Sequence, residues 1–189
     1  MKTGILTGSI RKGRQSHKVA VFLKLKLEEK GIEVDLIDLS EHPLPLYGAV
    51  ANAYDNYDKN IKTISNRLHD TDALIFVTPE YHGSFSGVIK NAIDHFWSEF
   101  QKKPIAVATA SAGRMGGINA STQLQHVILS IGAYPLPLKF LAPEVQTIFD
   151  SSNNPVSQSL ANAADKFLDE FLWLAEAVTQ KKKNELQPV

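Results

Sequence analysis

The stretch ALIFVTPEYHGSFSGVIKNAIDHFW (residues 73–97) passes from an uncharged apolar run, through a polar loop, into an amphipathic pattern. The run ALIFV is short and apolar throughout, as in strands that are buried on both faces of a sheet. After the loop, apolar side chains recur at the spacing of one helix face: Val88, Ile89, Ala92, Ile93 and Phe96. The loop itself carries an aromatic ring, a carboxylate and an imidazole, more than a plain turn requires. This stretch therefore predicts a strand, a ligand-facing loop and a helix in succession.

The same alternation of short apolar runs and helical patterns extends along the chain. The runs predict five strands: TGILTGS (3–9), IEVDLIDL (32–39), DALIFVTP (72–79), PIAVATAS (104–111) and AYPLPLKFL (133–141). Two prolines in the last run favour an edge strand, because proline cannot donate a ladder hydrogen bond. Strands with near-continuous apolar character need cover on both faces, so the sequence predicts an α/β doubly wound sheet. We expect a single domain over residues 1–180 and a C-terminal tail over 181–189.

Composition narrows the class of function. The 189 residues include 20 basic and 20 acidic side chains, and this balance argues against a general binder of nucleic acid or anionic membrane. Cysteine is absent, so disulfides, thiolate nucleophiles and iron–sulfur clusters are excluded, and redox chemistry would need a bound cofactor. We expect a cytoplasmic protein, because the N-terminal apolar run is too short for a signal peptide. The stretch SEHPLPLYGAVANAYDNYD (40–58) predicts an ordered loop over one edge of the sheet, with a possible partner contact.

Three polar, glycine-rich loops follow the first, third and fourth predicted strands: GSIRKGRQSHK (8–18), TPEYHGSFSG (78–87) and SAGRMGG (111–117). In a doubly wound sheet, ligands bind beyond the carboxyl ends of the strands, where the strand order reverses. We therefore expect these loops to share one site.

The first loop has the composition of a phosphate site. Ser9 and Ser16 offer hydroxyl groups, Arg11 offers a planar guanidinium, and a helix beginning near Ser16 offers free backbone N–H groups. The alternative is that Ser16 is only an N-cap and that Arg11, Lys12 and Arg14 are solvated. The glycine spacing matches neither a Walker loop nor a dinucleotide fingerprint.

The second and third loops suit a flat ring. Gly83 makes backbone N–H groups accessible beside Pro79 and Tyr81, and small residues in SAGRMGG allow close approach of the backbone. A serine–histidine hydrolase is disfavoured, because no GxSxG elbow is present. Tyr81 and His82 could also be ordinary loop residues, and Arg114 could meet a second anion or face water.

Taken together, GSIRKGRQS (8–16), PEYHGSFSGVIKNAIDHF (79–96) and SAGRMGG (111–117) resemble the NADPH-dependent FMN reductase family. The resemblance covers roughly residues 3–175. It implies a flavodoxin-like fold with a five-stranded parallel sheet in the order 2-1-3-4-5 and helices on both faces. This chain has His82 where the family commonly has Asn, and Ser86 where it commonly has Pro, which leaves the role of His82 open.

The resemblance also implies site residues. Those for the FMN phosphate are Ser9, Arg11, Ser16 and His17. Those for the isoalloxazine ring are Pro79, Glu80, Tyr81, His82, Gly83, Ser111, Gly113 and Gly116. For the basic residues Lys12 and Arg14, a contact to the NADPH phosphate is an alternative to solvated charge.

The implied activity is an FMN-dependent NAD(P)H oxidoreductase. Hydride would pass from NADPH or NADH through FMN N5 to a quinone, flavin or similar acceptor in a ping-pong cycle, with no catalytic protein residue and no metal. The alternatives are a non-catalytic FMN electron carrier and a redox sensor. Trp97 lies beside the apolar stripe of its helix, so we expect a homodimer or homotetramer that buries it, with a monomer as the alternative.

Overall fold

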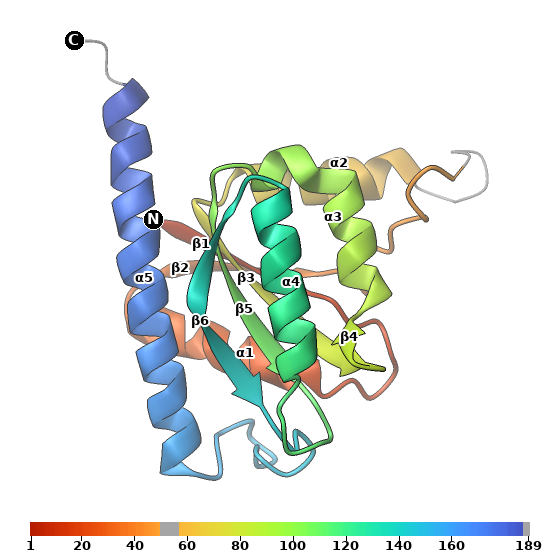
Figure 1. Ribbon diagram of the computed structural model, residues 1–189, viewed down its shortest axis with the longest axis vertical. Helices are drawn as coiled ribbons and strands as arrows, with labels where there is room; N and C mark the ends of the chain where they lie inside the picture. Colours follow the sequence, from red (N-terminus) through yellow and green to blue (C-terminus); the bar gives the residue numbers. More distant parts are fainter. Residues whose placement is uncertain (50–56, 187–189) are drawn as a thin grey trace.

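The computed structural model describes residues 1–49 and 57–186. Its sheet contains five parallel strands in the order β2-β1-β3-β5-β6, and a short strand β4 pairs antiparallel with β3 (Figure 1). The strands are β1 (Lys2–Thr7), β2 (Glu33–Asp38), β3 (Ala73–Tyr81), β4 (Ser84–Phe85), β5 (Pro104–Ala110) and β6 (Tyr134–Ala142). Counting only the five parallel strands, this order is the predicted 2-1-3-4-5. The predicted doubly wound parallel sheet is therefore confirmed.

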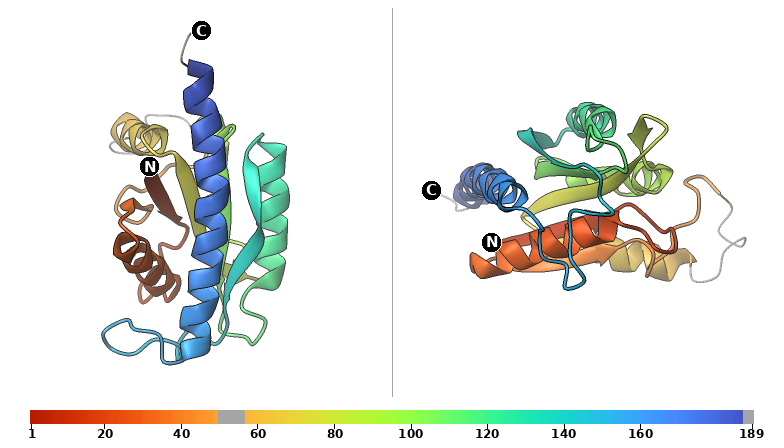
Figure 2. Two further views of the ribbon diagram at one scale, coloured as in Figure 1. Left: turned by 90° about the vertical axis from the view of Figure 1, so that its left-hand side faces the viewer. Right: turned by 90° about the horizontal axis from the view of Figure 1, so that it is seen from below.

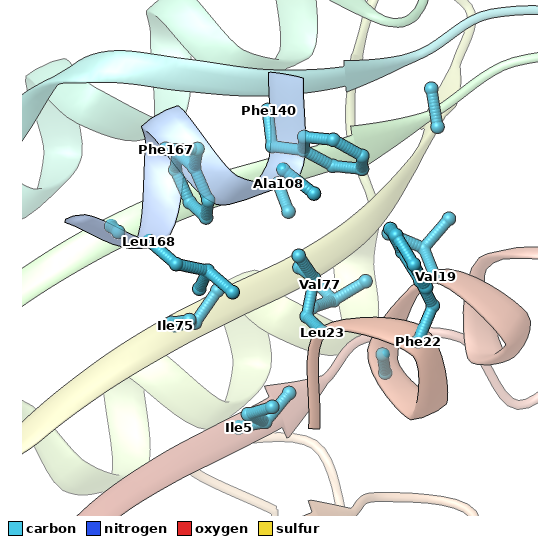
Figure 3. Close-up of a cluster of buried hydrophobic side chains, with 14 of the residues drawn as sticks. Ile5, Val19, Phe22, Leu23, Ile75, Val77, Ala108, Phe140, Phe167 and Leu168 are labelled. Atoms are coloured by element: carbon cyan, nitrogen blue, oxygen red, sulfur yellow. The ribbon is translucent and has the colours of Figure 1, made fainter. Parts of the chain in front are cut away.

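Helices cover both faces of the sheet (Figure 2). They are α1 (Ser16–Glu29), α2 (Tyr57–His69), α3 (Gly87–Phe100), α4 (Ile118–Ser130) and α5 (Gln158–Leu186). Helices α1 and α5 share one apolar core with the sheet, and α2, α3 and α4 share a second core on the opposite face. In the first core, Phe22 of α1 and Phe167 of α5 both pack against Phe140 of β6 (Figure 3). The strand runs are apolar on both sides because both sides of the sheet are covered.

Strand β6 occupies one end of the sheet order, as its two prolines predict. Its pairing with β5 shifts register between Ile105 and Val107, so the proline-bearing stretch is accommodated by an irregularity in the ladder.

Helix α5 continues through Lys181–Lys183 to Leu186, although the sequence analysis places these lysines in a tail. No glycine or proline interrupts the helix there, and Lys181 pairs with Glu185 one turn later, with 3.4 Å between Nζ and Oε1. The boundary expected after residue 180 thus falls inside a helix. None of the helices in the described part of the chain is both long and apolar enough to cross a membrane.

The loop expected over residues 40–58 is described in part, since residues 50–56 lie outside the described residues. Its described portion is tied to α3: Asn91 donates to the Pro45 carbonyl at 2.7 Å and accepts from the Tyr47 N–H at 2.9 Å. This portion therefore lies against α3, beside the helix that follows the second polar loop.

Candidate functional site

A cavity of about 350 Å³ lies at the carboxyl edge of the sheet, around the point where the strand order reverses between β1 and β3. Loops that follow four of the strands, β1, β3, β5 and β6, contribute to it. The lining residues are Ser9, Arg11, Lys12, Gly13, Arg14, Gln15, Ser16, Pro79, Glu80, Tyr81, Ala110, Ser111, Ala112, Val145 and Gln146. The three polar loops of the sequence analysis therefore do meet at one site, at the switch point where doubly wound sheets bind ligands.

The N-terminus of α1 opens at this cavity without a side-chain cap. Gln15 is the N-cap residue and makes no capping hydrogen bond, and the buried Ser16 is the first helical residue. The alternative that Ser16 is the N-cap is therefore wrong. When no side chain caps a helix N-terminus, the first backbone N–H groups are left free, and they carry a partial positive charge. This end of α1 can therefore bind an anion.

Arg14 is not solvated, contrary to the expectation for this residue. Its guanidinium forms two hydrogen bonds to Asp38, from Nη1 to Oδ1 at 2.6 Å and from Nη2 to Oδ2 at 2.5 Å. Nη1 also donates to the Ser9 carbonyl oxygen at 2.6 Å. The reason is topological: β2 pairs with β1 so that Asp38 lies opposite Thr7, directly before the first loop.

Asp38 is ionised within a nearly buried environment. Burial opposes its charge, but the hydrogen bonds from Arg14 and from the Ser40 backbone N–H outweigh burial and lower the pKa of Asp38 to about 2. Thr7 Oγ1 donates to the same carboxylate at 3.1 Å. His17 Nδ1 lies 3.4 Å from Asp38 Oδ2, so the imidazole faces this carboxylate.

Tyr81 joins the first and second loops. Its hydroxyl lies 3.3 Å from Ser9 Oγ, and the guanidinium carbon of Arg11 lies 5.6 Å from the centre of its ring. The two residues expected to bind a phosphate are thus in contact with a residue expected to bind a ring.

The second loop is a tight hairpin between β3 and β4. His82 and Gly83 are its central residues and have φ values of +52° and +78°, the pattern of a type I′ turn. Asn-Gly is the preferred pair in such turns, and His is among the few residue types that tolerate positive φ. The His82 side chain is exposed at the tip of the hairpin and does not line the cavity.

Helix α4 holds this hairpin in place. Glu80 Oε2 accepts a hydrogen bond from the Ala120 N–H at 3.0 Å, which satisfies a free amide in the first turn of α4. Gln123 Nε2 donates to the Gly83 carbonyl at 2.7 Å. The Glu80 carboxylate is therefore engaged with a helix N-terminus, although the residue lines the cavity.

Close packing holds the first and third loops at Gly8 and Gly116. A Cβ atom on Gly8 would lie 2.0 Å from Ile89 Cγ1, and one on Gly116 would lie 2.9 Å from Leu141 Cβ. Ser86 caps α3 by accepting from the Ile89 N–H at 3.3 Å, and its hydroxyl donates to the Gly8 carbonyl. Ser86 thus connects the end of β1 to the start of α3.

Seven of the twelve predicted site residues line the cavity and five do not. Those that line it are Ser9, Arg11, Ser16, Pro79, Glu80, Tyr81 and Ser111; the others are His17, His82, Gly83, Gly113 and Gly116. The sequence analysis missed Val145 and Gln146, which follow β6. Their only signal is their place after the fifth parallel strand, since this segment, PEVQT (143–147), has no glycine and no basic residue.

A model of the NADPH-dependent FMN reductase family matches residues 1–147. The chain belongs to the NADPH-dependent FMN reductase family. The predicted family is therefore confirmed, and with it an oxidoreductase that uses FMN as cofactor and NAD(P)H as co-substrate.

Individual relatives agree with this assignment. An FMN-dependent NADPH-azoreductase of Staphylococcus saprophyticus is 34% identical over 135 residues, which cover 69% of each chain. An NAD(P)H-dependent FMN reductase of Saccharomyces cerevisiae is 28% identical over 193 residues, covering 87% of this chain and 97% of the relative.

Solved structures confirm the flavodoxin-like fold. The flavoenzyme NAD(P)H:(acceptor) oxidoreductase FerB from Paracoccus denitrificans superposes with a TM-score of 0.80 at 24% identity, covering 93% of this chain and 97% of FerB. A flavodoxin from the domain Archaea superposes with a TM-score of 0.61 at 12% identity, covering 94% of this chain and 99% of the flavodoxin.

The donors at the cavity fit the phosphate of FMN. A phosphate monoester carries close to two negative charges and three acceptor oxygens at neutral pH. The uncapped amides of α1, the hydroxyl groups of Ser9 and Ser16 and the guanidinium of Arg11 supply donors and positive charge on one side of the cavity.

Proposed function

We propose that the cavity at the carboxyl edge of the sheet is the FMN site of this reductase. Ser9, Arg11, Ser16 and the first amides of α1 would bind the phosphate. Pro79, Glu80, Tyr81 and Ser111 would line the isoalloxazine ring. The observation that carries the proposal is the uncapped N-terminus of α1 opening at a cavity that three predicted loops share.

The protein's part in the reaction is to bind FMN, to orient it and to tune its chemistry. When bound, FMN supplies the redox chemistry, taking a hydride from NAD(P)H at N5 and passing the reducing equivalents to an acceptor. The backbone N–H groups of the loops after β3 and β5 would favour negative charge at the ring edge. Among the residues that line the cavity, none is assigned a proton-transfer role, because the hydride transfer requires no protein acid or base.

We further propose that NAD(P)H and the acceptor use one open face in turn, in a ping-pong cycle. The acceptor would be a quinone, a flavin or a similar planar compound. The names of the staphylococcal and yeast relatives, an azoreductase and an FMN reductase, support planar aromatic acceptors as the class.

Two measurements test this function. The flavin absorbance of the purified protein should bleach when NADPH is added without oxygen. Initial rates measured against NADPH at several quinone concentrations should then give parallel double-reciprocal lines. Intersecting lines would overturn the ping-pong cycle, and flavin bands that persist with NADPH would favour a carrier or redox sensor.

We also propose that the chain acts as a homodimer or homotetramer that buries Trp97. Trp97 lies on α3, and 52% of its surface is exposed. Large exposed aromatic side chains are enriched at interfaces between subunits. Sedimentation at micromolar concentration tests this proposal: a 20.8 kDa species would contradict it, and a Trp97→Glu variant should dissociate if it is correct.

A further inference from the structure

Arg14 lines the cavity, but its hydrogen bonds within the protein hold its guanidinium against Asp38 and the first loop. All three of its hydrogen bonds go to protein acceptors, two to Asp38 and one to the Ser9 carbonyl. Only 18% of its side chain is exposed, against 2% for that of Asp38. A bidentate guanidinium–carboxylate pair at this depth has a fixed geometry, because the planar fork matches the two carboxylate oxygens.

Asp38 is anchored independently of Arg14. It lies at the end of β2 and accepts from Thr7 Oγ1 at 3.1 Å and from the Ser40 N–H at 3.0 Å. Thr7 is the last residue of β1, so the carboxylate is fixed to two neighbouring strands. The pair is therefore built from the rigid sheet outward to the loop.

The contact from Arg14 to Ser9 determines the orientation of one peptide plane in the loop. The peptide unit is planar and trans, so fixing the Ser9 carbonyl also fixes the direction of the following N–H group, on Ile10. The same contact occupies a carbonyl oxygen that would otherwise repel an anion. Ser9 itself lines the cavity, and its Oγ lies 3.3 Å from the Tyr81 hydroxyl oxygen, so this peptide lies where the first and second loops meet.

We propose that Arg14 and Asp38 are a positioning pair that holds the first loop in its phosphate-binding form without touching the phosphate. This inference rests on the proposed function, which places the FMN phosphate at this loop. Arg14 also cancels the charge of Asp38, which would otherwise oppose an anion a few residues away. The phosphate then receives its positive charge from Arg11 and from α1.

The chain offers a matched control for this pair. Arg67 forms the same arrangement with Asp35, also on β2, with hydrogen bonds of 3.1 Å from Nε and 2.5 Å from Nη2. Arg67 likewise donates to a backbone carbonyl, that of Leu36, at 2.8 Å. Neither Arg67 nor Asp35 lines the cavity. Removing this pair should affect folding to a similar degree but leave the phosphate loop intact.

The test compares the affinities of the apoprotein for FMN and for riboflavin, which lacks the phosphate, by flavin fluorescence. The wild-type chain should bind FMN at least about tenfold more tightly than riboflavin, as expected for several charge-assisted hydrogen bonds. Arg14→Met and Asp38→Asn should each remove most of this preference and leave the riboflavin affinity unchanged. Arg67→Met should preserve the preference, whatever its effect on thermal stability.

Two further variants keep the test decisive. Arg14→Lys retains the charge but not the fork, and should recover part of the preference. The double variant Arg14→Met/Asp38→Asn leaves no unpaired carboxylate, and should be no worse than Arg14→Met if the two residues act as a unit.

An unchanged ratio of FMN to riboflavin affinity in Arg14→Met or in the double variant would overturn the positioning pair alone. An equal loss of affinity for both flavins would do the same, since it would indicate a general structural role. A wild-type chain that binds FMN and riboflavin equally would instead overturn the phosphate assignment itself, and the positioning pair with it.

Discussion

Arg11 lies over the ring of Tyr81, with 5.6 Å between the guanidinium carbon and the ring centre. A cation–π contact at an exposed site is worth about 0.5–1 kcal/mol. A hydrogen bond from a guanidinium to a charged partner is worth about 1.5–3 kcal/mol. The hydrogen bond from Arg11 to the phosphate should therefore be the stronger of the two interactions. We expect Arg11 to leave the Tyr81 ring when FMN binds.

Replacing Arg11 with alanine should weaken FMN binding by about 10- to 100-fold, since about 1.4 kcal/mol corresponds to a factor of ten. The affinity for riboflavin should not change. The measurement is a fluorescence titration of each flavin. Arg114→Ala is the control, because the Arg114 side chain is 91% exposed and its nearest acidic partner, Glu144, is 3.8 Å away. Equal FMN affinities for Arg11→Ala and the parent would show that Arg11 does not bind the phosphate.

Gly8 is required by packing between β1 and α3. Its Cβ would lie 2.0 Å from Ile89 Cγ1, and Ile89 is fully buried. Gly8→Ala should lower the free energy of unfolding by about 1–3 kcal/mol, as overpacked cores do. Urea unfolding measures this loss.

Gly87→Ala provides the comparison for Gly8. Nothing lies within 4 Å of a Cβ at Gly87, which begins α3. The free energy of unfolding of Gly87→Ala should equal that of the parent or exceed it by up to about 1 kcal/mol, since alanine favours the helix. A Gly8→Ala variant as stable as Gly87→Ala would contradict the close contact between Gly8 and Ile89.

Much of the fold was predictable, because a short run of apolar residues is enough to indicate a strand buried on both faces. The run ALIFV (73–77) is fully buried in the structure, and its neighbours in the sheet have the same character. The carboxyl ends of parallel strands share one edge, so polar loops that are distant in sequence could be placed together.

Pairings between loops and strands were not predictable in the same way. The sequence contains Arg14 and Asp38 but does not show that they are in contact. Their contact depends on the register between β1 and β2, which sets Asp38 opposite Thr7. The close contact between Gly8 and Ile89 is of the same kind, because it depends on how α3 packs against the end of β1. Register and packing across elements are tertiary properties that local patterns do not carry.

The departure at His82 has a local explanation. With φ of +52° before a glycine at +78°, this position favours asparagine. His82→Asn should leave the free energy of unfolding within about 0.5 kcal/mol of the parent, or raise it. FMN affinity should not change, because the imidazole does not line the cavity.

His82→Val is the opposing variant. A β-branched residue at positive φ should cost about 1–3 kcal/mol in thermal or urea unfolding. Weaker FMN binding by His82→Asn would show instead that the imidazole itself takes part in the site.

Lys103 lies at the opposite end of the sheet and should make stability depend on alkaline pH. It is 8% exposed and donates from Nζ to the Leu68 carbonyl. Burial, and then the nearby charge of Lys182, lower the pKa of Lys103 from 10.5 to about 8. Between these two values the unfolded chain binds more protons than the folded one, so stability rises with pH.

The free energy of unfolding should therefore increase from pH 8 to pH 10.5 by up to about 2–3 kcal/mol from this group, at about 1.36 kcal/mol for each pKa unit. Urea unfolding across this window measures the slope, and Lys103→Met should flatten it, because an apolar side chain leaves nothing to titrate. Lys183→Met, which removes an exposed lysine of α5, corrects for the loss of one cation. If Lys103→Met and Lys183→Met gave the same slope, the Lys103 ammonium would not be destabilised by burial.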